Sequence, residues 1–258
     1  MAIHPTAIVD SAAAIDASAE IGPYCSIGAD VRVGARTRLL GHAFIEGPIE
    51  IGEDNLFFPY STIGVAPQDL KYKGERSRTR IGNRNQIREF VTIHRGTEGG
   101  GMLTSLGDDN LLMAYTHVAH DTHVGNHTVI GHAATLGGHV TVGDWAVISA
   151  GSAVHQFCRI GRHCIIGGYS VITQDVLPYS TTVSPRDVKV FAANATGLER
   201  RGFSGEAIEN LHKAFRLMTR SNLNTSQAVE RITAELPLTP EIEELLEFIR
   251  TSERGFIK

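Results

Sequence analysis

An aliphatic side chain returns at every sixth position through most of this chain of 258 residues. The series covers Ile3–Ile63, where Phe57 is the one aromatic member, and Ile81–Ile93; it then slips by one residue and continues over Leu106–Ile172. Glycine follows the aliphatic residue at about half of these positions, far above its average usage of about 7%. A period of six matches neither an α-helix nor a long strand. It predicts a short strand and a sharp corner, repeated many times.

Such a repeat is expected to fold into a solenoid of triangular coils. Three hexapeptides close one coil of 18 residues, and successive coils stack as parallel strands about 4.8 Å apart, so the periodic aliphatic residues form one internal ladder. We therefore predict a mainly β protein with a parallel β-helix over residues 1–190. Residues 64–80 and 94–105 break the period and are expected to leave the solenoid as loops.

The end of the chain changes to helical spacing, and residues 191–258 are predicted to form a C-terminal α-helical domain. Ser204 is suited to cap one helix, and Pro240 is suited to the first turn of another. A weaker helical segment is expected over Ser226–Leu236. The apolar stripes of the two stronger helices are Ile208, Leu211, Phe215 and Met218, and Ile242, Leu245, Leu246 and Ile249.

Two positions of the repeat are expected to be sterically demanding. The glycine after the aliphatic residue should relieve the corner, where a positive φ would favour glycine. The residue two positions before the aliphatic one is usually small or β-branched, as at Thr122 and Ser152, and should point inward. Cys25, Cys158 and Cys164 occupy this inward position, so we interpret them as buried packing thiols and not as nucleophiles or metal ligands.

Bulk composition excludes several classes of function. The formal net charge of −4 lacks the basic excess that nucleic-acid binding requires. No apolar run approaches the ~18 residues of a membrane span, and the first residues lack the basic and apolar regions of a signal peptide. Three cysteines are too few for a disulfide scaffold. These features favour a cytoplasmic protein.

Residues 18 apart should lie one above another in this solenoid, which gathers several histidines. The columns 119–137–155, 120–138–156 and 121–139–157 stand side by side, over a height of roughly 10 Å at strand spacing. They bring together one candidate site: His120, Asp121, Gly138, His139, His155 and Gln156, with His117 at its flank.

The candidate site has the residue types of a general-base catalyst. A carboxylate such as Asp121 orients a neighbouring imidazole and stabilises its protonated form, so His120 is the predicted base. Gly138 offers a backbone N–H without an obstructing side chain, which suits an oxyanion donor. Since no serine or cysteine is placed as a nucleophile, direct attack by a bound substrate is favoured over an acyl-enzyme.

Other interpretations of the same residues stay open at this point. His127 and His132 have the spacing of γ-class carbonic anhydrases, which share this solenoid, but they fall on neighbouring faces of a coil, so another subunit would have to supply a third metal ligand. A hexapeptide acyltransferase that uses acetyl-coenzyme A is a second alternative. A solenoid that binds ligands without catalysis is a third.

Several longer motifs make the histidines part of a more specific pattern. They are Gln68-Asp69-Leu70-Lys71-Tyr72, Thr92-Ile93-His94-Arg95-Gly96-Thr97, Asn110-Leu111-Leu112-Met113, His117-Val118-Ala119-His120-Asp121, Val154-His155-Gln156-Phe157 and Arg200-Arg201-Gly202-Phe203. With these motifs, nearly the whole chain resembles the UDP-N-acetylglucosamine O-acyltransferases, which catalyse the first step of lipid A biosynthesis. The resemblance implies a left-handed parallel β-helix, no metal or cofactor, and a homotrimer with sites between subunits.

The resemblance also implies roles for individual residues. His120 matches the base that takes the proton from the glucosamine 3-hydroxyl, Asp121 matches its dyad partner, and Gly138 matches the oxyanion donor. The residues that match substrate-binding positions are Gln68, Asp69, Leu70, Lys71, His117, His139, His155, Gln156, Asn194, Arg200 and Arg201. Gly168 matches the residue that sets acyl length, and its small size implies a long acyl group.

The implied donor is a hydroxyacyl thioester of acyl carrier protein. Lys213, Arg216 and Arg220 lie on one side of the predicted helix after Ser204 and could meet an acidic partner of this kind. Two departures from the family pattern concern the acceptor: Thr196 stands where a glutamate is common, and residues 184–186 (Ser-Pro-Arg) stand where Gly-Asn is common. They leave open whether the acceptor is UDP-N-acetylglucosamine or its 3-amino analogue.

Overall fold

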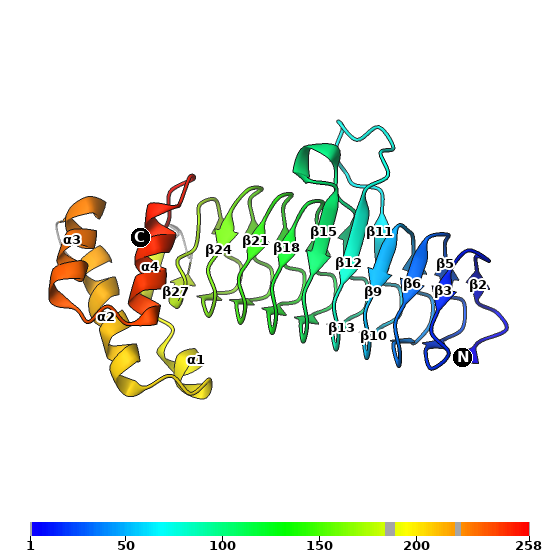
Figure 1. Cartoon of the computed structure of the whole chain (residues 1–258), viewed down its shortest axis with the longest axis horizontal. Coiled ribbons are helices and arrows are strands. Elements are labelled where there is room, and N and C mark those ends of the chain that lie inside the picture. Colours follow the sequence, from blue (N-terminus) through cyan, green and yellow to red (C-terminus); the bar gives the residue numbers. More distant parts are fainter. Residues whose placement is uncertain (1, 184–188, 220–222, 258) are drawn as a thin grey trace.

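The computed structural model describes residues 2–183, 189–219 and 223–257. Its strands wind into a long triangular parallel β-helix, which begins at the blue end of Figure 1 and meets a group of helices at the other end. Each turn of the chain contributes one strand to each of three sheets, which form the three faces of the prism. The predicted β-helix is therefore confirmed.

The first face is an 11-stranded sheet. Its strands are β1 (Ala2–Ile3), β4 (Glu20–Ile21), β7 (Arg38–Leu39), β10 (Leu56–Phe57), β13 (Gln86–Ile87), β16 (Leu111–Leu112), β19 (Val129–Ile130), β22 (Val147–Ile148), β25 (Ile165–Ile166), β27 (Ser180–Val183) and β28 (Lys189–Ala193). All neighbours pair in parallel except β27 and β28, which pair antiparallel and close the sheet.

The second and third faces contain nine and eight strands. The second face contains β2 (Ile8–Val9), β5 (Ser26–Ile27), β8 (Phe44–Ile45), β11 (Thr62–Val65), β14 (Thr92–His94), β17 (His117–Val118), β20 (Thr135–Leu136), β23 (Ala153–Val154) and β26 (Val171–Ile172). The third face contains β3 (Ala14–Ile15), β6 (Val31–Val33), β9 (Ile49–Ile51), β12 (Arg78–Ile81), β15 (Leu103–Leu106), β18 (His123–Val124), β21 (Thr141–Val142) and β24 (Arg159–Ile160).

The three corners of the prism are named here by the side chains they carry. The histidine corner joins the second face to the third and contains His120, Asp121 and His139. The tryptophan corner joins the third face to the first and contains Trp145 and His163. The aromatic corner joins the first face to the second and carries a column of exposed rings 4.8–5.1 Å apart, formed by Tyr24, His42, Tyr60, Phe90 and Tyr115.

Backbone register repeats every 18 residues wherever no loop intervenes. Ala2 pairs with Glu20, and His117 pairs with Thr135. The two predicted loops lengthen this step between neighbouring strands, so that Ile51 pairs with Ile81 and Leu112 pairs with Ile87. Both loops leave the histidine corner, where Figure 1 shows them projecting from the prism, and the second loop contains a short 3₁₀ helix, η1 (Glu98–Gly100).

The expected role of the repeat glycines is wrong. Positive φ falls instead on the third residue after the aliphatic one, as at Arg36 (φ 55°) and Trp145 (φ 63°), a left-handed conformation that non-glycine residues adopt here at every corner in turn. Gly22 and Gly137 have ordinary φ values, but an added Cβ would lie 2.4 Å from the carbonyl oxygen of Leu40 or 2.7 Å from the backbone nitrogen of Gln156. These glycines are required by the close approach of the next coil.

The prism interior is filled by the two inward positions of the repeat. The periodic aliphatic residues from Ile21 to Ile172 are buried, and so are the small residues two positions earlier, including Thr122 and Ser152. Cys25, Cys158 and Cys164 are free and buried, as predicted. Burial raises the pKa of the Cys158 thiol to about 11 and that of the Cys164 thiol to about 12.

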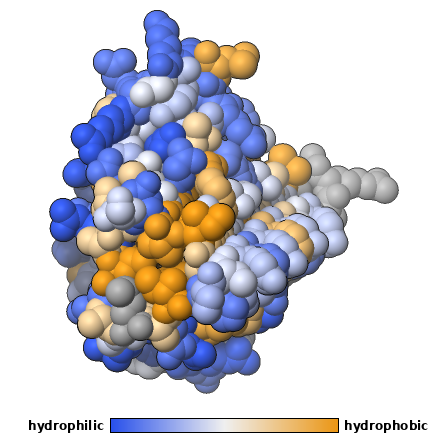
Figure 2. All heavy atoms as spheres, turned by 90° about the vertical axis from the view of Figure 1, so that its right-hand side faces the viewer, coloured by the Kyte–Doolittle hydropathy of each residue, from blue (hydrophilic) through white to orange (hydrophobic). Residues whose placement is uncertain are grey.

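The first coil leaves apolar side chains in contact with solvent. Figure 2 looks onto the end of the solenoid where the chain begins and shows apolar atoms gathered across it. Ile8 is 73% exposed and Ile3 is 36% exposed, whereas Ile21 and Ile27 in the next coil are 2% exposed. No coil of the described chain covers this end, because β1, β2 and β3 are the first strands of their sheets.

The other end of the solenoid meets four helices, α1 (Ala195–Arg200), α2 (Gly205–Thr219), α3 (Thr225–Glu235) and α4 (Pro240–Arg250). The hydroxyl of Ser204 accepts a hydrogen bond from the Ala207 backbone nitrogen (3.1 Å), and Pro240 opens α4, as predicted. Arg220 and residues 184–186 lie outside the described residues. Among the described helices, none is long and apolar enough to cross a membrane. Since β27 and β28 straddle residue 190, the division into domains there stays a prediction.

The inward ladder makes a stability prediction that compares two neighbouring residues of β22. Ile148 is fully buried, so Ile148→Ala should lower the free energy of unfolding by about 2–5 kcal/mol. Val147 points outward from the same strand, and Val147→Ala should have a clearly smaller effect. Urea unfolding followed by circular dichroism measures both variants, and equal losses would contradict the inward ladder.

Candidate functional site

The histidine corner brings His120, Asp121 and His139 together, as the 18-residue step predicts. His120 and Asp121 form the turn between β17 and β18, and Asp121 has φ 57°. One coil further, the His139 backbone nitrogen donates to the His120 carbonyl oxygen (3.0 Å). The two imidazole rings lie with centroids 5.1 Å apart and planes almost perpendicular.

His120 and Asp121 form a hydrogen-bonded pair. His120 Nδ1 lies 2.8 Å from Asp121 Oδ2, and the Asp121 side chain is 0% exposed. Because an ionised carboxylate can only accept hydrogen bonds, Nδ1 carries the proton and Nε2 of the neutral ring is left as an acceptor. The His120 side chain is 14% exposed, so this nitrogen can be reached from solvent through a narrow opening.

Asp121 is held by a residue that the sequence patterns did not single out. The Thr97 backbone nitrogen donates to Asp121 Oδ1 (2.8 Å), and the Thr97 hydroxyl donates to Asp121 Oδ2 (2.6 Å). Thr97 lies in the loop between β14 and β15, 24 residues before Asp121, so the inserted loop residues hide it from column arithmetic. Its place in the motif Thr92–Thr97 was the available signal.

Gly138 lies directly against the His120 ring. A Cβ added to Gly138 would lie 2.7 Å from His120 Cε1 and 2.8 Å from Nε2, so any larger residue would fill the space at the accepting nitrogen. The Gly138 carbonyl oxygen accepts from the Phe157 backbone nitrogen (3.0 Å), while its own N–H makes no hydrogen bond to the described residues. This N–H is available to a ligand.

Two further histidines, His94 and His117, extend the site along the second face. His117 Nδ1 lies 2.7 Å from the Thr92 hydroxyl, and the rings of His117 and His94 meet edge to face with centroids 4.8 Å apart. Burial lowers the pKa of His117 and lowers that of His94 to about 4. His94, 5% exposed and with Nδ1 unpaired among the described residues, was also missed as a site residue by the sequence patterns.

His139, His155 and Gln156 complete the upper part of the site. Burial lowers the pKa of His139, whose ring stacks on Phe157 with centroids 4.3 Å apart. His155 and Gln156 are exposed, and the Gln156 carbonyl oxygen accepts from Arg254 (3.0 Å). They lie in the turn after β23, one coil above the predicted oxyanion donor.

The loop over residues 64–80 reaches toward the same corner. The charge of Asp69 acts on His139, so this loop lies within electrostatic reach of the site. Gln68 and Lys71 are exposed, and the Leu70 side chain is fully exposed, at 105% of its reference area. An exposed leucine on a well-defined loop is typical of a surface that contacts another molecule.

Asn194, Arg200 and Arg201 do not join the histidines in this chain. The Asn194 amide donates to the His163 carbonyl oxygen (2.8 Å), and Arg201 lies over the Trp145 ring, 5.2 Å from its centroid. These residues therefore lie near the tryptophan corner, and Figure 1 shows α1 on the opposite side of the prism from the two loops. Arg200, Arg201 and the exposed Thr196 belong to α1 or its end.

Gly168 lies at the aromatic corner, in the turn between β25 and β26. A Cβ added there would meet only the Ala150 carbonyl oxygen, at 3.3 Å, and the neighbouring Tyr169 is 82% exposed. The position is open to solvent and is separated from His120 by the width of the second face.

The metal-site interpretation of His127 and His132 finds no support in the described residues. His127 stacks on Trp145 (4.0 Å), and His132 meets Tyr115 edge to face (5.5 Å), so they lie at different corners. The one set of three possible ligands among the described side chains is His120, Asp121 and His139.

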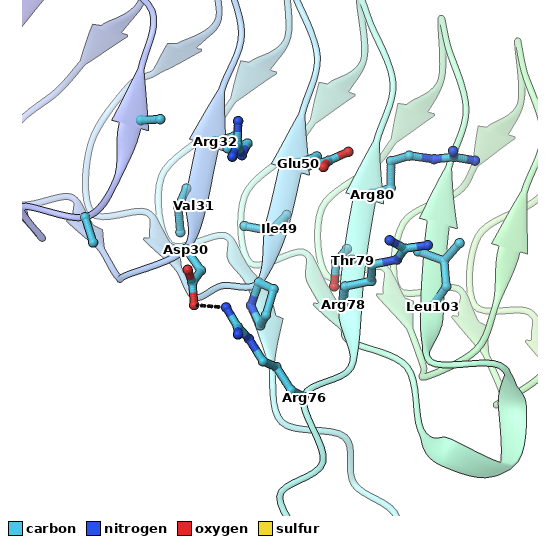
Figure 3. Close-up of a pocket in the computed structure, with 13 residues that line it drawn as sticks. Asp30, Val31, Arg32, Ile49, Glu50, Arg76, Arg78, Thr79, Arg80 and Leu103 are labelled. Carbon is cyan, nitrogen blue, oxygen red and sulfur yellow. Dashed lines mark hydrogen bonds and ion pairs between the residues drawn. The ribbon is translucent and has the colours of Figure 1, made fainter.

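A basic hollow lies on the third face, toward the N-terminus from the histidine corner. Figure 3 shows Arg32, Arg78 and Arg80 around it, with Arg76 paired to Asp30 at 2.8 Å. None of the predicted site residues lines this hollow, so the His120–Asp121 pair lies outside it, on the open corner.

Comparison with known proteins adds the family. A model described as UDP-N-acetylglucosamine O-acyltransferase, domain 2, matches residues 175–257, and a model of bacterial transferase hexapeptide repeats matches residues 104–138. A Thermodesulfovibrio yellowstonii protein named acyl-[acyl-carrier-protein]–UDP-N-acetylglucosamine O-acyltransferase is 48% identical over 256 residues, covering 99% of both chains. This chain belongs to the UDP-N-acetylglucosamine O-acyltransferase family. A Myxococcus xanthus member is 45% identical over the same length.

Solved structures of family members have the same fold. The UDP-N-acetylglucosamine acyltransferase of Bacteroides fragilis matches with a TM-score of 0.97 and 42% identity, covering 99% of this chain and all of that one. The Acinetobacter baumannii structure matches with a TM-score of 0.95 and 40% identity, covering 99% of both chains. The fold of this family member is the left-handed parallel β-helix, as the resemblance implied.

The buried histidines of this family member predict a loss of stability in mild acid. Unfolded His94 binds a proton below its ordinary pKa near 6.5, whereas folded His94 does so only near 4. The unfolded state therefore binds more protons between these values, and the folded state loses stability as pH falls through this window. NMR titration of the imidazole signals checks the cause, and a midpoint near 6.5 for His94 would contradict it.

Proposed function

We propose that this chain transfers an acyl group from acyl carrier protein to the 3-hydroxyl of UDP-N-acetylglucosamine, the first step of lipid A biosynthesis, in the cytoplasm. The single observation that carries the proposed chemistry is the buried pair of His120 and Asp121, 2.8 Å apart, beside a glycine with an unengaged N–H. The family name supplies the two substrates.

The proposed reaction begins with a proton transfer to His120. Nε2 accepts the proton of the sugar 3-hydroxyl as the oxygen attacks the thioester carbonyl, and Asp121 stabilises the resulting imidazolium through Nδ1. The carbonyl oxygen becomes an oxyanion that the Gly138 N–H can stabilise. Collapse of this intermediate breaks the C–S bond, and the protonated His120 returns its proton to the departing thiolate.

Direct attack by the sugar oxygen agrees with the state of the cysteines. A covalent acyl-enzyme would need an accessible nucleophile with a low pKa. Cys158 and Cys164 are instead buried inside the prism, and burial raises the pKa of both thiols well above neutral pH.

The remaining predicted contacts surround this pair. In the proposal, His139 and His117 line the sugar pocket, and the loop over Gln68–Lys71 covers the sugar nucleotide. His155 and Gln156 face the acyl donor from the coil above. Gly168 keeps the path of a long acyl chain open, since the turn that contains it offers room and an exposed aromatic neighbour.

The proposed enzyme is a homotrimer that shares its sites between subunits. Asn194, Arg200 and Arg201, the proposed nucleotide and phosphate contacts, lie near the tryptophan corner, while the base lies at the histidine corner. A second copy would supply one set to the other. The exposed Leu70 and the unpaired charge of the loop are consistent with a neighbouring subunit at this corner.

Replacement of the base provides the direct test. Since a positioned general base contributes roughly 10²–10⁴-fold, His120→Ala should lose at least about 100-fold in kcat in an assay with acyl carrier protein thioesters and UDP-N-acetylglucosamine. His132→Ala, an exposed histidine at another corner, is the matched control and should keep its activity. Turnover near normal in His120→Ala would refute the proposal.

Mixed trimers test the sharing of sites. His120→Ala and Arg201→Ala should each be inactive, but random trimers of both chains should regain about a quarter of the sites, because some sites then combine an intact base with an intact arginine. Light scattering establishes the mass of the assembly. Absence of any recovery in mixed trimers would show that His120 and Arg201 act within one chain.

A further inference from the structure

Thr97 makes two contacts to the buried carboxylate of Asp121, one to each oxygen. Its backbone N–H donates to Oδ1 (2.8 Å) and its hydroxyl donates to Oδ2 (2.6 Å), the oxygen that also accepts from His120 Nδ1 (2.8 Å). A carboxylate with donors on both oxygens cannot rotate without breaking one of them. The plane of the carboxylate, and with it the direction in which it holds the imidazole, is therefore fixed by Thr97.

The loop around Thr97 also shields the carboxylate from water. A Cβ added at Gly100 would lie 1.9 Å from Asp121 Cγ, and one added at Gly96 would lie 2.8 Å from Asp121 Oδ1. The loop is closed on itself by the Met102 backbone nitrogen, which donates to the Thr97 carbonyl oxygen (2.9 Å). Asp121 is thus covered by a loop with no side chains at the two points of closest approach.

Thr97 itself does not reach the substrates. It is 3% exposed, and its hydroxyl is engaged with Asp121 below the His120 ring. Its influence on the reaction must pass through the carboxylate. This separates Thr97 from residues such as His139, whose side chain is 20% exposed at the open corner.

We propose that Thr97 is a positioning residue for the acyl transfer, which holds Asp121 so that His120 presents Nε2 to the acceptor hydroxyl. The inference rests on the proposed function, because it assumes that His120 is the base. It adds a third member to the pair, supplied by a loop that leaves the solenoid and not by the repeat.

Several other titratable groups face this pair, and any change in pH dependence must be compared with theirs. They are His139 from the next coil, His94 and His117 from β14 and β17, His123 from β18, and Asp69 from the loop over residues 64–80. None of them donates a hydrogen bond within 3.5 Å of the carboxylate in the described structure; the nearest, His139 Nε2, lies 3.9 Å from Oδ2.

The test compares Thr97→Val, which removes the hydroxyl at constant shape, with Thr97→Ser, which keeps it. Thr97→Val should lower kcat by about 10- to 100-fold, the loss that removal of an orienting hydrogen-bond partner causes in comparable metal sites, with KM for both substrates unchanged. Its acid limb in kcat/KM should move to higher pH, because a carboxylate with one donor fewer holds the protonated dyad more strongly. Thr97→Ser should restore most of the rate.

Thr104→Val is the matched control for lost stability. Thr104 is equally buried, and its hydroxyl accepts from the Asp121 backbone nitrogen (2.8 Å) without touching the carboxylate. This variant should reduce the unfolding temperature but leave the acid limb in place. An equal shift of the acid limb in Thr104→Val, or an equal loss in Thr97→Ser and Thr97→Val, would overturn the positioning role.

The assay of His120→Ala separates the two proposals. If His120→Ala is inactive while Thr97→Val keeps the normal kcat and acid limb, only the role of Thr97 is wrong. If His120→Ala is active, the proposed base is wrong and the inference falls with it.

Discussion

The hydrogen bonds between successive coils are the interaction on which the rest of this molecule depends. They fix each strand in register with the strand 18 residues earlier, so every position of the hexapeptide repeats along the prism in a straight column. The inward columns form the core, and the corner columns carry left-handed residues of many types. A side chain placed in one coil therefore acquires neighbours at a set height and direction, without help from long-range packing.

This regularity explains how much could be predicted from the sequence. The step of 18 residues was sufficient to place Asp121 beside His139 and Gly138 beside His120, since no insertion lies between them. Thr97 escaped prediction because the inserted residues before β15 change the step to one that a periodic pattern does not contain. The repeat glycines were located correctly but explained wrongly, because contact between coils cannot be read from one coil.

The position of Asn194 and Arg201 could not be predicted from the repeat either. The chain leaves its period before β28, and the side on which α1 packs is decided by local contacts such as those with Trp145 and His163. In the proposed enzyme this separation has a chemical use. The base and its carboxylate stay rigid within one solenoid, while the groups that recognise the nucleotide belong to a different surface and can vary without disturbing the pair.

The exposed first coil gives the molecule a direction. Each later coil rests on a complete one, but the strands β1, β2 and β3 have a neighbour on one side only, and Ile8 is left 73% exposed beside them. Open strand edges next to uncovered apolar side chains are the features through which β-proteins associate wrongly. The beginning of the solenoid is thus its weakest boundary against aggregation, and a polar cap placed there would protect the whole stack without approaching the catalytic corner.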